Sequence, residues 1–244
     1  MPVTIHHGLY LPFQTILKLE NIIVQTTGDG SHTLFVPGLN EHYHSMYGAL
    51  QESEQVFIHN GLHHVPDCIK EINILEIGFG TGLNALLAVL EAKKQRRKIN
   101  YVAIEPEPVA VEILEKLNYA TVIGSTEAEG YFKKLHETNW VYPAFLSDYF
   151  ILSKLKARLE DITLRDEQFH LVFFDAFGPE VQPELWTEEI FSQLFKCLKP
   201  DGILVTYSCK GTVKRALKSA GFTIEKLPGP AGKREVLRAI KNRN

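Results

Sequence analysis

The chain has 244 residues, of which 45% are hydrophobic and 23% are charged, and its net charge is −3. This length and apolar fraction fit one or two domains with a large buried core, which excludes disordered and fibrous proteins. The charge is unevenly distributed along the chain. Residues 196–244 contain twelve Lys or Arg and three acidic residues, a net charge of +9, whereas residues 1–195 carry −12. This distribution predicts an acidic body with a basic C-terminal end.

The first 70 residues are irregular, with three short segments that we expect to be extended: Ile22–Thr26, Thr33–Val36 and Gln55–Ile58. Asp29-Gly30, between the first two, is typical of a tight turn. We expect residues 1–70 to form an N-terminal extension that packs on the core as a substrate lid, and residues 71–244 to form the main domain.

Strands and helices alternate from residue 73 onward. In chain order we predict a strand at Asn73–Ile77, a helix from Leu83 through Leu90, a strand at Tyr101–Ile104, a helix at Val109–Leu117, a strand at His170–Phe174, a helix at Trp186–Leu198, a turn at Lys199–Gly202, a strand at Ile203–Tyr207, a helix at Thr212–Ala220 and a hairpin of Phe222–Lys226 and Val236–Ile240. The pattern does not clearly divide residues 119–153. The alternation predicts an α/β fold with a doubly wound, mostly parallel sheet whose last strand turns back antiparallel.

A glycine-rich loop, Gly78-Phe-Gly80-Thr-Gly82, follows the first of these strands. A dinucleotide fingerprint would need glycine in place of Leu83, and no Lys-Ser/Thr follows as it does in a P-loop. With Glu76 before the loop, the pattern is Glu-x-Gly-x-Gly-x-Gly, which many S-adenosylmethionine-dependent methyltransferases have. A carboxylate there suits the amino-acid and sulfonium end of that cofactor. The alternative without a ligand is a purely structural turn, with the acidic side chains in solvent.

Glu105 ends the second strand, where a carboxylate can accept hydrogen bonds from both hydroxyls of a ribose. The loop and the two acids occur in the order that a class I methyltransferase requires. We therefore predict a site for S-adenosyl-L-methionine formed by Glu76, Gly78, Phe79, Gly80, Gly82, Asn84, Glu105, Pro106 and Asp175.

The third strand ends in an acid and an aromatic residue, Asp175 and Phe177, which we predict to be catalytic. An amine must be neutral to attack a methyl group, and a nearby carboxylate can orient it and help to receive its proton. Phe177 suits stacking on a planar base or lining the path of the methyl group. The alternatives are a helix or turn cap for Asp175 and a core position for Phe177.

The C-terminal part carries clustered cations on one helix face and in a Gly/Pro-rich loop. Lys210, Lys214 and Lys218 recur at intervals of four residues, opposite an apolar stripe. We predict that the cluster binds RNA phosphates rather than forming only a solvated face. The residues of this RNA-binding prediction are Lys210, Lys214, Arg215, Lys233 and Arg234, although Arg234 and Glu235 also suit an internal ion pair.

Eight of the ten histidines lie in residues 1–64, but their spacing does not indicate a metal site. Neither His42/His44 nor His63/His64 has a nearby Cys or a helical i, i+4 partner, so we predict no bound metal and a polar lid or substrate wall instead.

The three cysteines form no Cys-x-x-Cys pair, the N-terminus does not resemble a signal peptide, and no apolar run reaches the roughly 20 residues of a membrane span. We expect a cytoplasmic protein without a membrane partner.

Several motifs together resemble the MnmC-like methyltransferase family. They are Ile-Leu-Glu76-Ile-Gly-Phe-Gly-Thr-Gly-Leu-Asn84, Phe-Phe-Asp175-Ala-Phe-Gly-Pro, Pro183-Glu-Leu-Trp186-Thr and Gly232-Lys-Arg-Glu235. The likeness runs from about Asn40, through Glu52-Ser-x-x-Val-Phe-Ile58, to about Ala239.

The resemblance implies a Rossmann-like class I fold, Asp175 in the catalytic position and an N-terminal segment that helps to close the site. It also implies methylation of the 5-aminomethyl group on the wobble uridine of tRNA, giving 5-methylaminomethyl(-2-thio)uridine. Bifunctional relatives carry a C-terminal flavin domain, whereas this chain ends at Asn244, so we expect no FAD domain in this chain. The family's Asp-Asp-Val-Tyr-Phe-Ser is replaced here by Glu41-His-Tyr-His-Ser45, and the adenine-contacting acid is either Glu160 or Asp161.

Three other functions stay open from the sequence. One is methylation of a small-molecule or protein amine, and another is aminopropyl transfer as in spermidine synthases, against which the basic rim argues. A non-catalytic RNA-binding module is the third, and it would not bind the cofactor.

Overall fold

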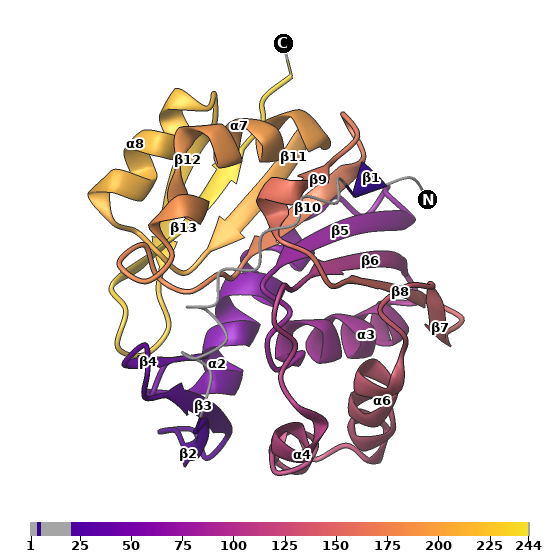
Figure 1. Ribbon diagram of the computed structural model, residues 1–244. Helices are drawn as coiled ribbons and strands as arrows, with labels where there is room; N and C mark the ends of the chain where they lie inside the picture. The colour runs from indigo at the N-terminus through magenta and orange to yellow at the C-terminus, as the bar shows by residue number, and fades with distance from the viewer. Residues whose placement is uncertain (1–3, 6–20, 244) are drawn as a thin grey trace.

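The computed structural model describes residues 4–5 and 21–243, and one eight-stranded sheet forms its centre (Figure 1). Its strands lie in the order β12-β13-β11-β10-β5-β6-β8-β7. In chain order they are β5 (Glu71–Ile77), β6 (Lys98–Ile104), β7 (Ala144–Ser147), β8 (Phe150–Leu155), β10 (Phe169–Phe174), β11 (Leu198–Thr206), β12 (Thr223–Pro228) and β13 (Glu235–Ile240). The five central strands are parallel, whereas β13 is antiparallel to β11 and β12, and β7 to β8. This confirms the expected mostly parallel sheet with an antiparallel C-terminal strand.

Both faces of the sheet are covered by helices, which explains why its central strands read as continuous apolar runs. Helices α3 (Leu83–Gln95), α5 (Tyr119–Ile123) and α6 (Thr126–Glu137) pack with one hydrophobic core, and α7 (Glu188–Cys197) and α8 (Gly211–Ser219) pack with the other. Figure 1 shows α3 and α6 on one side of the sheet and α7 and α8 on the opposite side. The sheet is therefore doubly wound.

The N-terminal extension lies beside one end of the sheet (Figure 1) and shares its core through Val56, Phe57 and Leu62. It consists of the antiparallel strands β2 (Ile23–Thr26), β3 (His32–Val36) and β4 (Glu41–His42), then α2 (Ala49–Ser53), a π-helical segment at Glu54–His59 and a 3-10 turn at Leu62–His64. The short strand β1 (Thr4–Ile5) pairs antiparallel with β9 (Ile162–Thr163). A 3-10 turn at Leu159–Asp161 directly precedes β9.

The expectation of a strand at Gln55–Ile58 is wrong, because these residues continue the helix that begins at Ala49. Val56, Phe57 and Ile58 are all buried, and a short run of consecutive apolar residues is ambiguous between a buried strand and a helix wedged into a core. Asp29 helps to start this helix, since its carboxylate accepts the Gln51 N–H at 2.9 Å.

Other boundaries differ from the predicted ones. The helix expected at Val109–Leu117 is only α4 (Val111–Leu114), and the one expected from Trp186 begins after Thr187, whose side chain caps it. Trp186 instead lies in a 3-10 turn, Pro183–Trp186. The turn expected before Ile203 is an irregular part of β11, where Asp201 has a φ of 61°.

No helix among the described residues is long and apolar enough to cross a membrane.

Candidate active site

The carboxyl ends of β5, β6 and β10 meet at one edge of the sheet, and the predicted acids lie there. The strand order reverses between β5 and β10, which is where parallel α/β sheets bind ligands. Backbone hydrogen bonds hold the loops after these strands together: Gly78 N–H donates to the Ile104 carbonyl at 3.0 Å, and Asp175 N–H to that of Ile77 at 2.9 Å. Glu76, Glu105 and Asp175 are thus brought to one place.

The glycine loop needs glycine for both conformation and space. Gly78, Gly80 and Gly82 have φ values of 87°, 49° and 75°, in the left-handed region that favours glycine. A Cβ on Gly78 would lie 2.6 Å from the Asp175 carbonyl oxygen, and one on Gly80 would lie 3.0 Å from Cδ1 of Tyr43. The loop therefore packs closely between the strand end that carries Asp175 and the N-terminal extension.

Glu105 is tied directly to the glycine loop. Its carboxylate accepts the N–H of Gly80 and the N–H of Glu107, both at 3.0 Å. Burial raises the pKa of Glu105 to about 7. A fixed carboxylate beside the loop fits a ligand that presents two neighbouring hydroxyls, as the ribose of the predicted cofactor does.

Asn84 links the two other acids of the site. Its side-chain amide donates to Glu76 Oε1 at 3.0 Å and to Asp175 Oδ2 at 2.8 Å. Within the described residues, the buried atoms Glu76 Oε2 and Asn84 Oδ1 have no hydrogen-bond partner. Burial, and then the charge of Asp175, raises the pKa of Glu76 well above its usual range. The Tyr101 hydroxyl, also without a partner among the described residues, is near Glu76, and the ammonium of S-adenosylmethionine is a donor that these two acceptors suit.

Asp175 and Phe177 lie where the site opens. Burial, followed by the charge of Glu52, raises the pKa of Asp175 to about 7. Phe177 is fixed through its backbone, since its N–H donates to Gln182 at 3.0 Å and its carbonyl accepts from Trp186 Nε1 at 2.8 Å. Both residues are only partly buried, so they are accessible to a second substrate.

The N-terminal extension supplies an aromatic ring to this opening. The ring of Tyr43 lies edge-on to that of Phe177, with 5.0 Å between centroids and 74° between planes, and it also covers Gly80. The sequence offered no role for Tyr43, because its partners lie far away along the chain. The contact is what a lid over the site would make.

Two residues of the predicted cofactor site, Phe79 and Pro106, are not among the hydrogen-bonded groups described above. The Phe79 ring is only 3% exposed and packs against His136 and Trp140, with centroids 5.8 and 5.7 Å away, so its side chain belongs to the core. Pro106 follows Glu105 and is partly buried.

The two acids considered for the adenine contact are both exposed. Glu160 pairs with Arg158 at 2.8 Å, and the residues directly after β8 are Lys156-Ala157-Arg158. The prediction that either Glu160 or Asp161 contacts the adenine is therefore unchanged.

The predicted RNA-binding cations differ in how free they are. Lys214 is partly buried on α8, whereas Arg215 and Arg234 are exposed. Lys210 pairs with Glu180, and Lys233 pairs with Glu52. Glu235 pairs with Lys226 at 3.3 Å rather than with Arg234.

The histidines within residues 21–243 take part in hydrogen bonding and packing. His42 contacts Gln25 at 3.0 Å, His63 contacts Glu91 at 2.9 Å, and burial lowers the pKa of His44 to about 4. No group of three or more His, Cys, Asp or Glu among the described residues could hold a metal ion. His6 and His7 lie outside the described residues.

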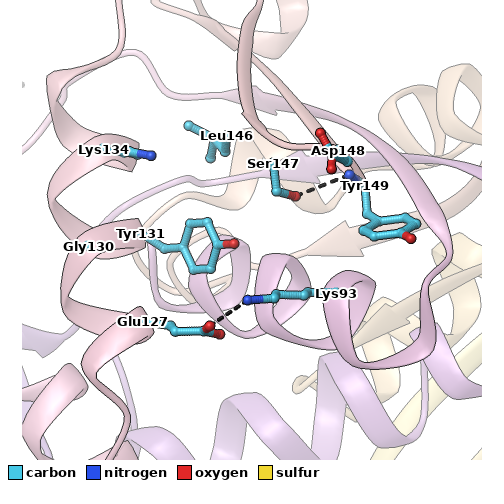
Figure 2. Close-up of a pocket in the computed structure, with 9 residues that line it drawn as sticks. All are labelled: Lys93, Glu127, Gly130, Tyr131, Lys134, Leu146, Ser147, Asp148 and Tyr149. Carbon is cyan, nitrogen blue, oxygen red and sulfur yellow. Dashed lines mark hydrogen bonds and ion pairs between the residues drawn. The ribbon is translucent and has the colours of Figure 1, made fainter.

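A surface hollow of about 390 Å³ lies elsewhere, between α3, α6 and the β7–β8 turn (Figure 2). Because that turn precedes β8, the hollow is at the opposite edge of the sheet from the site. Its lining residues are Lys93, Glu127, Gly130, Tyr131, Lys134, Leu146, Ser147, Asp148 and Tyr149. None of the predicted site residues is among them.

Comparison with known proteins also indicates a methyltransferase that uses S-adenosylmethionine. A family model described as "S-adenosyl-L-methionine-dependent methyltransferase" matches residues 149–242. The "tRNA 5-methylaminomethyl-2-thiouridine biosynthesis bifunctional protein MnmC" of Campylobacter hominis is 29% identical over 220 residues, which are 86% of this chain and 32% of the relative. The chain thus spans about a third of the length of that curated relative.

Solved structures also match. MnmC2 from Aquifex aeolicus superposes with a TM-score of 0.74 and 25% identity, over 92% of this chain and 71% of that one. A spermidine synthase from Thermotoga maritima shares the fold, with a TM-score of 0.57 and 16% identity over 91% and 70% of the two chains. The chain therefore carries an MnmC-like methyltransferase domain with a Rossmann-like class I fold, and its cofactor is S-adenosyl-L-methionine.

Proposed function

We propose that this protein methylates the 5-aminomethyl group on the wobble uridine of tRNA, giving 5-methylaminomethyl(-2-thio)uridine. The observation that carries the proposal is the position of Asp175, which is hydrogen-bonded to the cofactor residue Asn84 on one side and lies beside the partly exposed Phe177 on the other. The matched relative of Campylobacter hominis is named for this tRNA modification, which supports the choice of acceptor. Such an enzyme is expected to act in the cytoplasm.

The residues of the site divide the work of methyl transfer. S-adenosylmethionine, when bound, supplies an electrophilic methyl group on its sulfonium. We assign the ribose hydroxyls to Glu105, and the ammonium to Glu76 and Asn84. Asp175 then orients the acceptor amine and takes its proton directly or through water, while Phe177 and Tyr43 border the path of the planar base. A pKa of about 7 for Asp175 suits that exchange near neutral pH.

The tRNA is expected to lie across the basic end of the molecule. Lys214, Arg215 and Arg234 are the cations that we assign to its phosphates, with Lys210 beside them. They come from α8 and from the loop between β12 and β13, and that loop contacts the N-terminal extension beside the site through Lys233 and Glu52.

The test is an incubation of the purified protein with S-adenosylmethionine labelled in its methyl group and tRNA carrying 5-aminomethyluridine, followed by nucleoside analysis. We expect label in 5-methylaminomethyluridine, and none when the tRNA has unmodified uridine at the wobble position. Label that appears only in a small amine or a protein would contradict the proposal and would favour the alternative acceptors.

Aminopropyl transfer is checked in the same series. The spermidine synthase likeness is one of fold. Replacing the cofactor by its decarboxylated form and the tRNA by putrescine should give no product, and formation of spermidine would favour that reaction instead.

A further inference from the structure

Two of the sequence motifs meet in the structure although 181 residues separate them along the chain. Glu52, from Glu-Ser-x-x-Val-Phe-Ile, lies on α2 of the N-terminal extension, and Lys233, from Gly-Lys-Arg-Glu, lies in the loop between β12 and β13. The Lys233 ammonium forms an ion pair with Glu52 Oε1. Neither residue has a role in the cofactor site described above.

The ion pair is built into its surroundings. Glu52 is only 5% exposed, and its second oxygen, Oε2, accepts the Ser45 N–H at 2.7 Å. The Lys233 ammonium lies over the Tyr207 ring, 4.0 Å from its centroid. The carboxylate of this ion pair is buried and hydrogen-bonded, and the ammonium is half-buried and stacked on an aromatic ring. This is the geometry of a specific contact rather than of a loose surface pair.

The neighbouring residue Gly232 completes the contact between the two segments. Gly232 has a φ of 79°, and a Cβ on it would lie 2.1 Å from Cδ2 of Tyr47, so no larger residue fits against that ring. In Figure 1 the yellow loop between β12 and β13 lies beside the indigo β4 and α2. The loop and the extension are therefore packed together at this point.

Tyr207 connects this contact to the catalytic strand end. Its hydroxyl donates to the carbonyl of Ala176 at 2.9 Å, and Ala176 follows Asp175 directly. Lys233 is thus separated from the Asp175 segment by one aromatic side chain. The two charges act on Asp175 in opposite directions, since Glu52 raises the pKa of Asp175 and Lys233 lowers it.

We propose that Glu52 and Lys233 are a positioning pair, which fastens the N-terminal extension to the β12–β13 loop and holds both against the strand end that carries Asp175. The pair also balances the charge felt by Asp175. This inference rests on the proposed function, in which Asp175 receives the proton of the acceptor amine. It gives Lys233 an internal role in place of the tRNA contact predicted from the sequence.

Other charged and titratable groups also act at Asp175, and the test has to hold them constant. The titratable groups on the surrounding elements are Glu76 on β5, Tyr101 on β6, Tyr119 on α5 and Tyr207 after β11, and the uncharged Asn84 on α3 donates a hydrogen bond to Asp175. The pair itself is Glu52 on α2 and Lys233 in the loop. Substituting only the last two isolates the pair.

The experiment measures the pKa of Asp175 by ¹³C NMR of its side-chain carboxyl in the full chain, with the signal assigned by Asp175→Asn. Glu52→Gln removes one negative charge and leaves Lys233, so we expect the pKa of Asp175 to fall by about half a unit to one unit. In Glu52→Gln/Lys233→Met the cation is also gone, and the pKa should return toward the wild-type value. Neither variant leaves Glu52 buried and unpaired.

The matched control is Lys226→Met, which removes an exposed ion pair on the same hairpin and should leave the Asp175 signal unchanged. Equal shifts in Glu52→Gln and in the control, or no shift in Glu52→Gln, would overturn the proposal. Circular dichroism and thermal melting identify any variant that fails to fold. If Glu52→Gln does not fold, Glu52→Asp is used instead; it retains the charge and should leave the pKa of Asp175 as in the wild type.

The pH profile of kcat provides the second readout. The acidic limb should move to lower pH in Glu52→Gln and back again in the double variant, which a merely structural contact would not cause. The NMR titration needs no acceptor. If the pKa of Asp175 shifts as expected and tRNA is not methylated, the proposed function is wrong and the role of the pair is supported. If tRNA is methylated and the pKa does not shift, the proposed function is supported and the role of the pair is wrong.

Discussion

At the residue scale the site depends on Asp175, whose carboxylate is shared between two neighbours of different kinds. Asn84 fixes one of its oxygens at 2.8 Å, and burial keeps its pKa near 7. A group in this state can exchange a proton with an amine near neutral pH, which a solvated aspartate, ionised from about pH 4 upward, does poorly. The same burial makes Asp175 costly to ionise in the free protein.

We predict that Asp175→Ala lowers kcat about 10²-fold or more, because the amine loses its proton acceptor, while S-adenosylmethionine affinity changes only a few-fold. Single-turnover methylation and calorimetric titration of the cofactor measure the two effects separately. Asp175→Asn, which can still accept the Asn84 hydrogen bond, is the control for lost structure. A loss of cofactor affinity as large as the loss of kcat would make Asp175 a binding residue.

The residues found from the sequence are those whose chemistry coincides with a strand end. Glu76, Glu105 and Asp175 each follow an apolar run, so their place at one sheet edge could be predicted from the pattern alone. Tyr43 and Glu52 could not be assigned roles, because their partners Phe177 and Lys233 lie more than 130 residues away and no periodicity relates them.

At the scale of elements, α8 separates its functions between two faces. Val213 and Leu217 are buried against the sheet, while Arg215 is exposed and Lys214 half-exposed. The apolar spacing predicted this helix to within about one residue at each end. The helix at residues 49–59 was read wrongly in part because its buried run has no period that separates helix from strand.

Charge reversal on α8 tests its assignment to tRNA. Lys214→Glu/Arg215→Glu should weaken tRNA binding and reduce the slope of log K against log salt by about 2, since two phosphate contacts are lost. Filter binding at several salt concentrations measures the slope. Lys133→Glu/Lys134→Glu makes the same change of charge on α6, across the sheet, and should leave the slope unchanged. Equal effects of the two variants would return α8 to a solvated face.

At the scale of the whole molecule, the division into an acidic body and a basic end is partly neutralised inside the fold. Of the twelve cations in residues 196–244, six form ion pairs with acids of the described part of the chain: Lys210, Lys226, Lys233, Arg238, Lys241 and Arg243. Three of these acids, Glu52, Glu167 and Glu180, belong to residues 1–195 and are not counted in the charge of the tail. The +9 of the tail therefore overstates the charge that is open to a nucleic acid.

The acidic site has a consequence for the stability of the whole fold. Asp175 has a folded pKa of about 7 against 3.8 ordinarily, so the folded state holds its proton more tightly than the unfolded state. Between about pH 4 and pH 7, raising the pH therefore lowers the free energy of unfolding, and above pH 7 the effect is constant. His44, His136 and His170, whose pKa values burial lowers to about 4, act in the opposite direction, so a variant is needed to isolate Asp175.

We predict that Asp175→Asn is more stable than wild type, and that its advantage grows by about 2 kcal/mol between pH 5.5 and pH 7.5 before levelling off. Urea unfolding of both proteins at each pH, without cofactor, measures the difference, in which the histidine contributions cancel. Saturating S-adenosylmethionine should narrow the gap, because its cationic end compensates the carboxylates of the site. An advantage that is constant with pH would mean that Asp175 is already ionised at pH 5.5 in the folded protein.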